Sequence, residues 1–357
     1  MKFLKQISSA LLVISVYSLH AQDVRVSNGL YVTVDDKAQI VMNGMGLNNN
    51  GNFRANSGTL IFTGGQNEGA AYISGSSFPI LYHLIIDRSS GDLLLNTRIF
   101  VNGNLELVNG NLELNNYSID LGSTGKLTGE SRRARITGQH GGYIKATAFL
   151  QSPKDANPGN LGLQLNSEAN LGSTTIIRGH LQQLNRDGEL SIARYYEIDP
   201  AFPVANNVKV HAYFLDVESA NLDPMELVLW SSDDAGRNWS PVKTDSKDYE
   251  LTKAIGSGGM RVTYFNRQST SNQLNNAFIQ LYPNPVRDRF TLAYYSTDEE
   301  DIVVNLYTKN GQLLEAKKIR AVAGLNKIDW SVSKYAAGNY QLRVLNKNGK
   351  NLAFVKE

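Results

Sequence analysis

Two closely spaced carboxylate pairs in this 357-residue chain could in principle perform acid–base chemistry. Glu197 and Asp199 stand two residues apart, as do Asp216 and Glu218. On a β-strand the members of each pair would share one face. Glycoside hydrolysis uses two carboxylates about 5–10 Å apart. Pairs at this sequence spacing are frequent by chance, so neither pair is nominated as a catalytic site.

Nitrogen and sulfur ligands are scarce. The histidines beyond the N-terminal segment (His83, His140, His180 and His211) are scattered without metal-site spacing, and we expect them to be structural or surface residues. The sequence has no cysteine, which excludes disulfides, iron–sulfur clusters and cysteine zinc sites. Phosphate-binding loops, serine elbows and zinc-protease helices are also absent from it. We therefore expect no cofactor and no metal.

The most basic stretch before the C-terminal region contains Arg132, Arg133 and Arg135, with Lys145 beyond. Lyases built on β-solenoids use Arg or Lys as a base near bound calcium, and a basic solenoid face could hold an acidic glycan. No tight aspartate cluster for calcium lies nearby in the sequence. A solvated strand or corner is the favoured interpretation, and contact with a polyanion is kept as a hypothesis.

Another polar segment, 232–239, resembles the Asp-box, Ser-x-Asp-x-Gly-x-Thr-Trp, with Asn238 in place of threonine. Sialidases carry several such boxes, which would imply glycan processing. A single copy without an arginine-rich site favours a structural hairpin instead. In that hairpin Ser232 begins the turn, Asp234 caps backbone amides, Gly236 is left-handed and Trp239 packs under the loop.

The overall composition is that of a turn-rich β protein. Hydrophobic residues make up 41% of the chain, enough for packed cores, and the 31 glycines with abundant Asn and Ser favour turns over helices. The net charge of +2 gives no electrostatic reason to expect nucleic acid or an anionic membrane as a partner. We predict an all-β protein.

Short runs of alternating apolar residues fill the first part of the chain up to about residue 150. Its clearest repeat is the heptad Val101–Leu107, which recurs unchanged as Val108–Leu114. A hairpin around Asn109-Gly110 would place Glu106 opposite Glu113, like charge against like. On a solenoid the leucines would point inward and the Asn-Gly pairs would mark corners. We favour a parallel β-solenoid over residues 22–150, similar to the β-helical regions of Bacteroidetes surface and adhesin-like proteins.

A turn-rich connection at 152–160 precedes a second region, which we assign to residues 151–265. Seven strand-like runs predict a β-sandwich there: Gly172–Gly179, Ile192–Ile198, Val208–Leu215, Glu226–Trp230, Trp239–Lys243, Tyr249–Ala254 and Met260–Tyr264. The region resembles a module that often follows such solenoids in this bacterial group, and this resemblance implies no activity. The polar segment 266–276 is expected to be a flexible linker.

The last region, 277–357, contains further short strands with Asn-Gly hairpin turns, typical of a small Ig-like β-sandwich. An ordered set of residues closely resembles the type A C-terminal sorting domain of the type IX secretion system of Bacteroidetes: Tyr282, Pro283, Asn284, Pro285, Gly311, Gly338, Tyr340 and Lys356. The resemblance implies handling by the type IX machinery and its sortase. It also implies delivery through the periplasm to the medium or the outer-membrane surface.

The N-terminus has the pattern of a secretory signal peptide. Lys2 and Lys5 precede the apolar run Ile7–Leu19, and a cut after Ala21 would leave Gln22. The run is shorter than the ~20 residues of a transmembrane helix, so we expect an exported protein without a membrane span. We predict that residues 22–268, here called the passenger, form a non-catalytic structural, adhesin-like or glycan-binding protein that touches glycans or a host or neighbouring cell. The alternative is a polysaccharide lyase or hydrolase acting on the solenoid.

Overall fold

The computed structural model describes residues 23–65, 69–186, 188–204, 208–245, 248–251, 255–256, 258–266, 279–282, 284–296, 298–322, 324–345 and 350–357. Strands account for 56% of the structure and helices for 3%, which confirms the all-β prediction. The expected signal peptide and most of the expected linker lie outside the described residues. Within the described part of the chain, no helix is long and apolar enough to cross a membrane.

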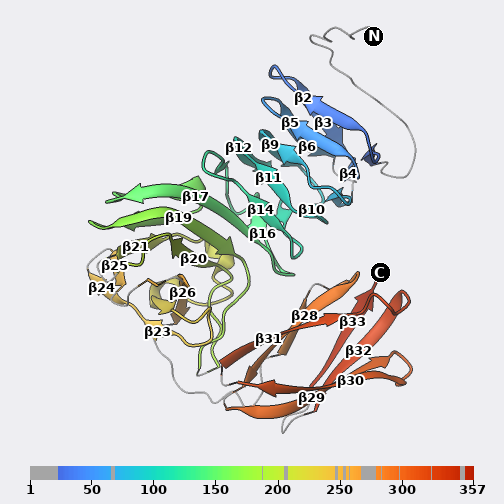
Figure 1. The fold of residues 1–357 in the computed structure, drawn as a ribbon, viewed down its shortest axis with the longest axis vertical. Helices are drawn as coiled ribbons and strands as arrows, with labels where there is room; N and C mark the ends of the chain where they lie inside the picture. Colours follow the sequence, from blue (N-terminus) through green and yellow to red (C-terminus); the bar gives the residue numbers. More distant parts are fainter. Residues whose placement is uncertain are drawn as a thin grey trace. The chain divides into compact units, whose positions relative to one another are not determined.

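The N-terminal region is a parallel β-solenoid of about five turns, as predicted (Figure 1). Each turn contributes one strand to each of three sheets, and every strand pairs with the equivalent strand of the next turn. The first sheet contains β1 (Val24–Val26), β4 (Leu47–Asn49), β7 (Ala71–Ser74), β10 (Leu93–Leu95), β13 (Leu112–Glu113) and β16 (Ile136–Thr137). The second runs through β2 (Tyr31–Val34), β5 (Asn52–Ala55), β8 (Ile80–Leu81), β11 (Ile99–Val101), β14 (Ser118–Asp120) and β17 (Tyr143–Gln151). The third contains β3 (Gln39–Asn43), β6 (Thr59–Gly64), β9 (His83–Arg88), β12 (Asn104–Asn109) and β15 (Lys126–Thr128).

Columns of apolar side chains form the solenoid core. In the third sheet Leu60, Leu84, Leu105 and Leu127 lie at equivalent positions of successive turns, and all are at most 1% exposed. Alternation along each short strand sends these side chains inward and their neighbours outward. Each turn therefore buries its apolar edge only by stacking on the next turn.

The duplicated heptad lies on two different faces of one turn. Its first copy supplies β12 and its second supplies β13, and both pair in parallel with neighbouring turns. The solenoid prediction was right and the hairpin alternative was wrong. The Asn-Gly pairs lie at corners: Gly110 has φ of 78°, and a Cβ on Gly103 would stand 2.5 Å from the carbonyl oxygen of Tyr82.

Polar side chains donate hydrogen bonds to backbone carbonyls at and near the corners of the solenoid. The amide of Asn115 donates to the carbonyl of Leu95 and, at 2.8 Å, to the side chain of Asn96. Arg88 is 1% exposed, and its guanidinium donates to the carbonyls of Thr63, Gly69 and Gly91. These bonds use backbone acceptors that would otherwise be buried without partners.

The central region contains two antiparallel sheets, the expected sandwich. One contains β19 (Asn170–Gly179), β20 (Tyr195–Pro200), β26 (Met260–Asn266), β22 (Leu227–Ser232) and β23 (Ser240–Pro241). The other contains β18 (Leu163–Asn166), β21 (Val208–Ala212), β25 (Asp248–Leu251) and β24 (Lys243–Asp245), and three 3-10 turns accompany the strands: η1 (Pro158–Asn160), η2 (Asp216–Glu218) and η3 (Pro224–Glu226). The Tyr264 hydroxyl donates to the carbonyl of Ala212, which ties β26 to the facing sheet.

Strand positions in this region follow the predictions with shifted ends. The strand expected from Ile192 begins only at Tyr195, because Arg194 belongs to a buried polar network described below. The strand Leu163–Asn166 was missed. Leu163 and Leu165 alternate with polar residues, but the strand has only four residues and closely follows the turn-rich connection, so its periodicity is too short to separate it from that connection.

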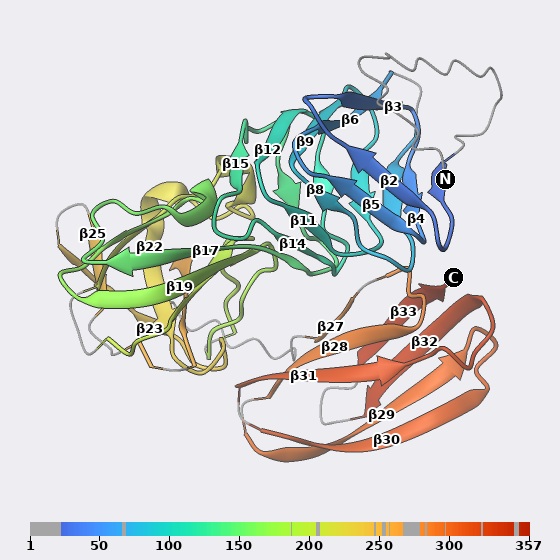
Figure 2. The same cartoon turned by 45° about the horizontal axis from the view of Figure 1, so that its top comes forward.

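The C-terminal region is a second antiparallel sandwich (Figure 2). One layer contains β27 (Ile279–Tyr282), β28 (Arg289–Ser296) and β31 (Gly324–Ser331); the other contains β30 (Leu313–Ala321), β29 (Glu300–Thr308), β32 (Gly338–Leu345) and β33 (Lys350–Lys356). The short strands expected from the sequence are present. Their core includes Phe290, Trp330, Leu342 and Phe354, each at most 1% exposed.

By compactness the chain divides into two units. The first contains the solenoid up to Thr137 together with Tyr143–Thr147 and Pro158–Leu161, and the second contains Gly138–Gly142, Ala148–Asn157 and Gly162–Glu357.

Candidate functional site

The first and last segments of the C-terminal domain's sequence contact each other along β33. The side chain of Asn284 accepts a hydrogen bond from the Val355 amide at 2.9 Å and donates to the carbonyl of Ala353 at 3.3 Å. Two backbone hydrogen bonds follow, from the Val286 amide to Val355 and from the Glu357 amide to Val286. The loop after β27 is thereby fixed to the end of β33. Pro283 lies outside the described residues.

The other resemblance-bearing residues lie near this end of the sandwich. Gly338 at the start of β32 pairs with Lys356, and Tyr340 pairs with both Phe354 and Thr308. The Tyr340 hydroxyl donates to the carbonyl of Ala336 at 2.6 Å. Gly311, with φ of 85°, lies in the turn that follows Thr308. Motif positions that are far apart in sequence are thus brought to one end of the domain.

Residues 280–355 match the family described as the secretion system C-terminal sorting domain. No curated protein matches the chain. The C-terminal sandwich is a type IX secretion sorting domain, and the chain is cargo of that system, exported to the cell surface or the medium. The type IX secretion machinery is therefore a partner of this chain.

The Asp-box-like segment forms the turn between β22 and β23. One Asp234 oxygen accepts from the backbone amides of Arg237 and Asn238 at 3.1 and 2.9 Å, and the other accepts from the Asn238 side chain at 2.7 Å. Ser232 donates to Asp234 at 2.7 Å. Burial raises the pKa of Asp234, but these hydrogen bonds outweigh it and leave the pKa below its usual value.

The same turn is anchored in the sandwich by Trp239 and Gly236. Trp239 is 7% exposed, and its indole N–H donates to the carbonyl of Gly236 at 3.1 Å. Gly236 has φ of 85°, and a Cβ there would lie 2.8 Å from the guanidinium of Arg261. The hydrogen-bonding groups of the turn are used within the turn itself, and its glycine packs against a buried arginine.

The arginine-rich stretch 132–135 is a corner between β15 and β16 and contains no strand. Arg132 and Arg133 are exposed, whereas Arg135 is half-buried and donates to the carbonyl of Arg132 at 2.7 Å. The sequence left open whether this stretch is a solvated strand or a corner, and the structure shows a corner.

The two carboxylate pairs lie in different kinds of secondary structure. Glu197 and Asp199 lie on β20, but Asp216 and Glu218 occupy η2, so the expectation that they share a strand face was wrong. The turn forms because Glu218 is drawn inward: it accepts from Arg194 and from the Leu215 amide, both at 2.8 Å. Glu218 is 5% exposed.

His180 completes this buried network. Its Nδ1 lies 3.3 Å from Glu218 Oε1, and both side chains are 5% exposed. Burial lowers the pKa of His180 to about 4 although its hydrogen bond to Glu218 opposes this. Burial raises the pKa of Glu218, but hydrogen bonding from His180 and the charge of Arg194 outweigh it and lower the pKa to about 2. At neutral pH the native network is therefore a buried Arg–Glu pair with a neutral histidine.

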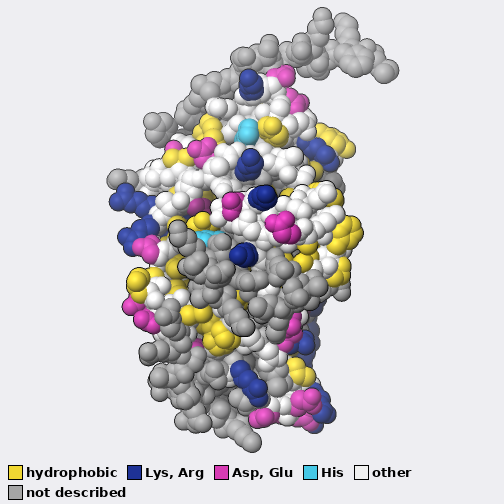
Figure 3. Space-filling view, turned by 90° about the vertical axis from the view of Figure 1, so that its left-hand side faces the viewer, with side chains coloured by type: hydrophobic (Ala, Val, Ile, Leu, Met, Phe, Trp, Pro, Cys, Tyr) yellow, Lys and Arg dark blue, Asp and Glu magenta, His cyan; other side chains and the backbone are white. Residues whose placement is uncertain are grey.

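Two further histidines, His83 and His211, make local contacts. His83 Nδ1 accepts from the Asn104 amide at 2.9 Å, and His211 packs on Tyr213 with ring centroids 4.3 Å apart. Within the described residues, no group of three or more histidine or acidic side chains is arranged to hold a metal. Basic and acidic side chains are interspersed on the face shown in Figure 3.

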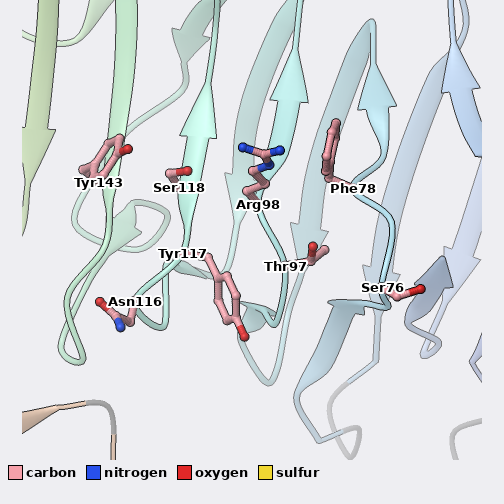
Figure 4. Close-up of a pocket in the computed structure, with 8 residues that line it drawn as sticks. All are labelled: Ser76, Phe78, Thr97, Arg98, Asn116, Tyr117, Ser118 and Tyr143. Atoms are coloured by element: carbon pink, nitrogen blue, oxygen red, sulfur yellow. The ribbon is translucent and has the colours of Figure 1, made fainter. Parts of the chain in front are cut away.

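A groove of about 510 Å³ on the solenoid was not anticipated from the sequence. Its lining, here called the solenoid groove, consists of eight residues: Ser76, Phe78, Thr97, Arg98, Asn116, Tyr117, Ser118 and Tyr143. Figure 4 shows them in two rows, with Phe78, Arg98, Ser118 and Tyr143 side by side on successive turns. Each of these four stands just before or at the start of a strand of the second sheet.

Solenoid geometry explains how the groove forms. Ser118 pairs with Tyr143, and Ile99, the neighbour of Arg98, pairs with Ile119, the neighbour of Ser118. Parallel in-register stacking therefore aligns side chains that stand 20, 20 and 25 residues apart in the sequence. No local motif marks such a site, and the usable signal is a polar or aromatic residue recurring at the spacing of the coil.

Proposed function

We propose that the passenger is a non-catalytic, adhesin-like binding protein that type IX secretion delivers to the cell surface or medium, where it contacts glycans. The observation that carries this proposal is the solenoid groove. It combines aromatic rings, hydroxyl groups, an amide and one guanidinium, the side-chain types that recognise sugars without transforming them.

The chemistry of the lining favours binding over turnover. Catalysis by general acid–base groups needs titratable side chains held in a concave site. None of the eight lining residues is Asp, Glu, His or Lys. The acidic residues described above lie in the sandwich region, where Glu218 is already paired with Arg194.

A glycan-binding screen of the mature exported chain tests this function. The purified protein is incubated with a panel of acidic and neutral polysaccharides, and both binding and the release of reducing or unsaturated ends are recorded. We expect measurable binding with no product. Turnover of any polysaccharide, abolished by a single substitution, would make the passenger a lyase or hydrolase and contradict the proposal.

Export itself provides a second test, because the sorting domain forms its own core. Deleting Phe278–Glu357 should leave the passenger folded but retained in the periplasm. Fractionation with limited proteolysis reports both location and folding. Normal surface levels of the truncated chain would contradict the assigned role of the domain.

Processing at the two ends belongs to the same proposal. We infer that a signal peptide is removed after Ala21 and that a sortase cleaves within 267–277, a polar stretch of sequence of the kind found in linkers. Mass spectrometry of the mature protein should find Gln22 at the N-terminus and no peptide from the sorting domain.

A further inference from the structure

We propose that the solenoid groove binds a segment of an acidic polysaccharide, with a uronate carboxylate seated on the guanidinium of Arg98. This inference rests on the glycan-binding function proposed above and specifies its site and its class of ligand. Three features of the groove support it: the charge of Arg98, the aromatic and hydroxyl groups around it, and the spacing of the solenoid turns.

Arg98 is held in place by aromatic rings. Its guanidinium lies 4.1 Å from the centroid of the Phe78 ring and 5.8 Å from that of Phe100, and these two rings are 5.3 Å apart. A guanidinium stacked on a ring keeps its N–H groups directed outward in its own plane. The stacking fixes the side chain before any ligand arrives, which reduces the entropy lost on binding.

The positive charge of Arg98 is not neutralised by the protein. The side chain is exposed, and in the described part of the chain no carboxylate forms an ion pair with it. The acidic residue on the neighbouring outer column, Asp120, is paired with Lys145 at 2.9 Å. The guanidinium of Arg98 is therefore available to a ligand carboxylate. Arginine and carboxylate groups frequently form a bidentate pair with two parallel N–H···O hydrogen bonds.

The rest of the lining suits sugar rings better than a bare anion. Phe78 is 39% and Tyr143 37% exposed, so both rings are accessible to a ligand. Such rings can stack on the apolar faces of pyranose rings. Hydroxyl groups of Ser76 and Ser118 and the amide of Asn116 can exchange hydrogen bonds with sugar hydroxyls. A nucleic acid would need several cations here, and the lining supplies one.

The repeat of the solenoid fits a linear polymer. Adjacent strands of a sheet are spaced by roughly 4.7–4.9 Å, comparable with the length that one pyranose residue adds to an extended chain. The first row of groove residues spans four successive turns of the second sheet. A polysaccharide lying along the solenoid axis would thus contact one set of side chains per sugar residue. The uronate carboxylate would be bound at the turn that contains Arg98.

The experiment measures binding of the mature exported chain to polygalacturonate by calorimetry at low salt. Fully methyl-esterified polygalacturonate, which keeps the rings and removes the charge, is the matched ligand. Polyglutamate, which keeps carboxylates and removes the rings, is the second control. We expect binding to polygalacturonate that weakens with salt, at least roughly tenfold weaker binding to the ester, and little binding to polyglutamate.

Substitutions locate the site. Arg98→Gln should weaken polygalacturonate binding by about tenfold or more, the usual effect of losing a charge-assisted hydrogen bond. Arg133→Gln removes the same charge at the 132–135 corner and should change affinity less than about twofold. Ser118→Asp, which places a carboxylate beside Arg98, should mimic the loss without removing the arginine, and thermal melts confirm that each variant is folded.

Each result supports or overturns a distinct statement. If no polysaccharide binds, the proposed function itself is wrong. If polygalacturonate binds and Arg98→Gln and Ser118→Asp leave its affinity unchanged, the function stands and this site is wrong. A loss seen only with Arg133→Gln transfers the contact to the corner, and equal binding of polyglutamate shows that the groove recognises charge alone.

Discussion

The solenoid and the sandwich that follows it handle their polar side chains in opposite ways. In the sandwich, charged groups point inward and pair with each other: Glu218 with Arg194 and His180, and Arg261 with Glu197 and Gln183. In the solenoid, the buried charged side chains among the described residues are Arg88 and Glu113, and the other charged side chains are at least partly exposed. Arg98 rests there on aromatic rings without a carboxylate partner among the described residues.

This difference follows from topology. A parallel solenoid stacks equivalent positions of successive turns, so columns of apolar residues such as Leu84 and Leu105 fill its interior. The residues that alternate with them form columns on the exterior. The antiparallel sandwich joins strands from distant parts of the chain, and its interior can contain a polar network whose members are fixed individually. Internally satisfied groups stabilise the fold, whereas unsatisfied exposed groups remain available for a ligand.

The largest expected effect comes from the sandwich. Trp239→Ala should destabilise it by about 3–5 kcal/mol, because a buried indole that also closes the 232–239 turn is lost. Hydrogen exchange read by mass spectrometry, peptide by peptide, should show lost protection in β22 and β23 with the solenoid unchanged. Trp239→Phe is the matched control and should retain most of the stability. Unchanged exchange in Trp239→Ala would contradict the structural role of the turn.

The next effect belongs to the solenoid. Leu105→Ala should cost about 2–5 kcal/mol, since the side chain is fully buried between Leu84 and Leu127. Because each turn contacts only its neighbours, increased exchange should be confined to the adjacent turns. Val108→Ala, in the second heptad copy and 45% exposed, should be close to neutral. A loss of protection spread equally over the whole chain would contradict the expectation that each solenoid turn is stabilised only by its neighbours.

The buried network predicts how the stability of the sandwich depends on pH. His180 stays neutral in the native state down to about pH 4, whereas the unfolded chain takes up a proton near pH 6.5. Stability should therefore fall as the pH drops from 6.5 to 4, by on the order of 2–3 kcal/mol. Glu218, whose native pKa is about 2, adds a further loss between pH 4.5 and 2.

Chemical denaturation at several pH values, followed by exchange of sandwich peptides, checks this dependence. In His180→Gln the decline between pH 6.5 and 4 should flatten, and the decline below 4.5 should persist. Solenoid peptides provide the internal control, because this buried network lies outside the solenoid. An unaltered pH profile in His180→Gln would show that this histidine does not control the titration.

The sequence predicted elements that are continuous in the chain and missed those that assemble across it. The heptad copies 101–107 and 108–114 and the strand pattern of 278–357 carry their signal in neighbouring residues, so the solenoid and the sorting sandwich were both expected. The groove residues Phe78, Arg98, Ser118 and Tyr143 come from different turns and share no local motif. Only the in-register stacking of the turns brings them together.

Errors in the local assignments have the same origin. Asp216 and Glu218 alternate as strand residues would, but the tertiary pairing of Glu218 with Arg194 holds the segment in a 3-10 turn. The basic stretch 132–135 lies at a corner, as one of the two local conformations expected for it, and its contact with a polyanion stays a prediction; none of its residues lines the groove. Composition located charge in the chain but did not show which charge is left without a partner.

The smallest expected effect concerns the Asp-box turn, where the comparison is sharpest. Asp234 accepts hydrogen bonds from two backbone amides and two side chains of the turn, so most of its acceptor capacity is used within the turn. Asp234→Ala should cost about 1 kcal/mol, as the loss of a cap does. Asn238→Thr, which restores the residue usual in the box, should change stability by less than about 0.5 kcal/mol, because a threonine hydroxyl can also donate to Asp234.

Both variants should bind polysaccharide as the parent does, because their effect is confined to the folded turn. A selective loss of polysaccharide binding in Asp234→Ala, with its thermal melt unchanged, would instead make this turn a ligand site and remove the contrast between the sandwich and the solenoid.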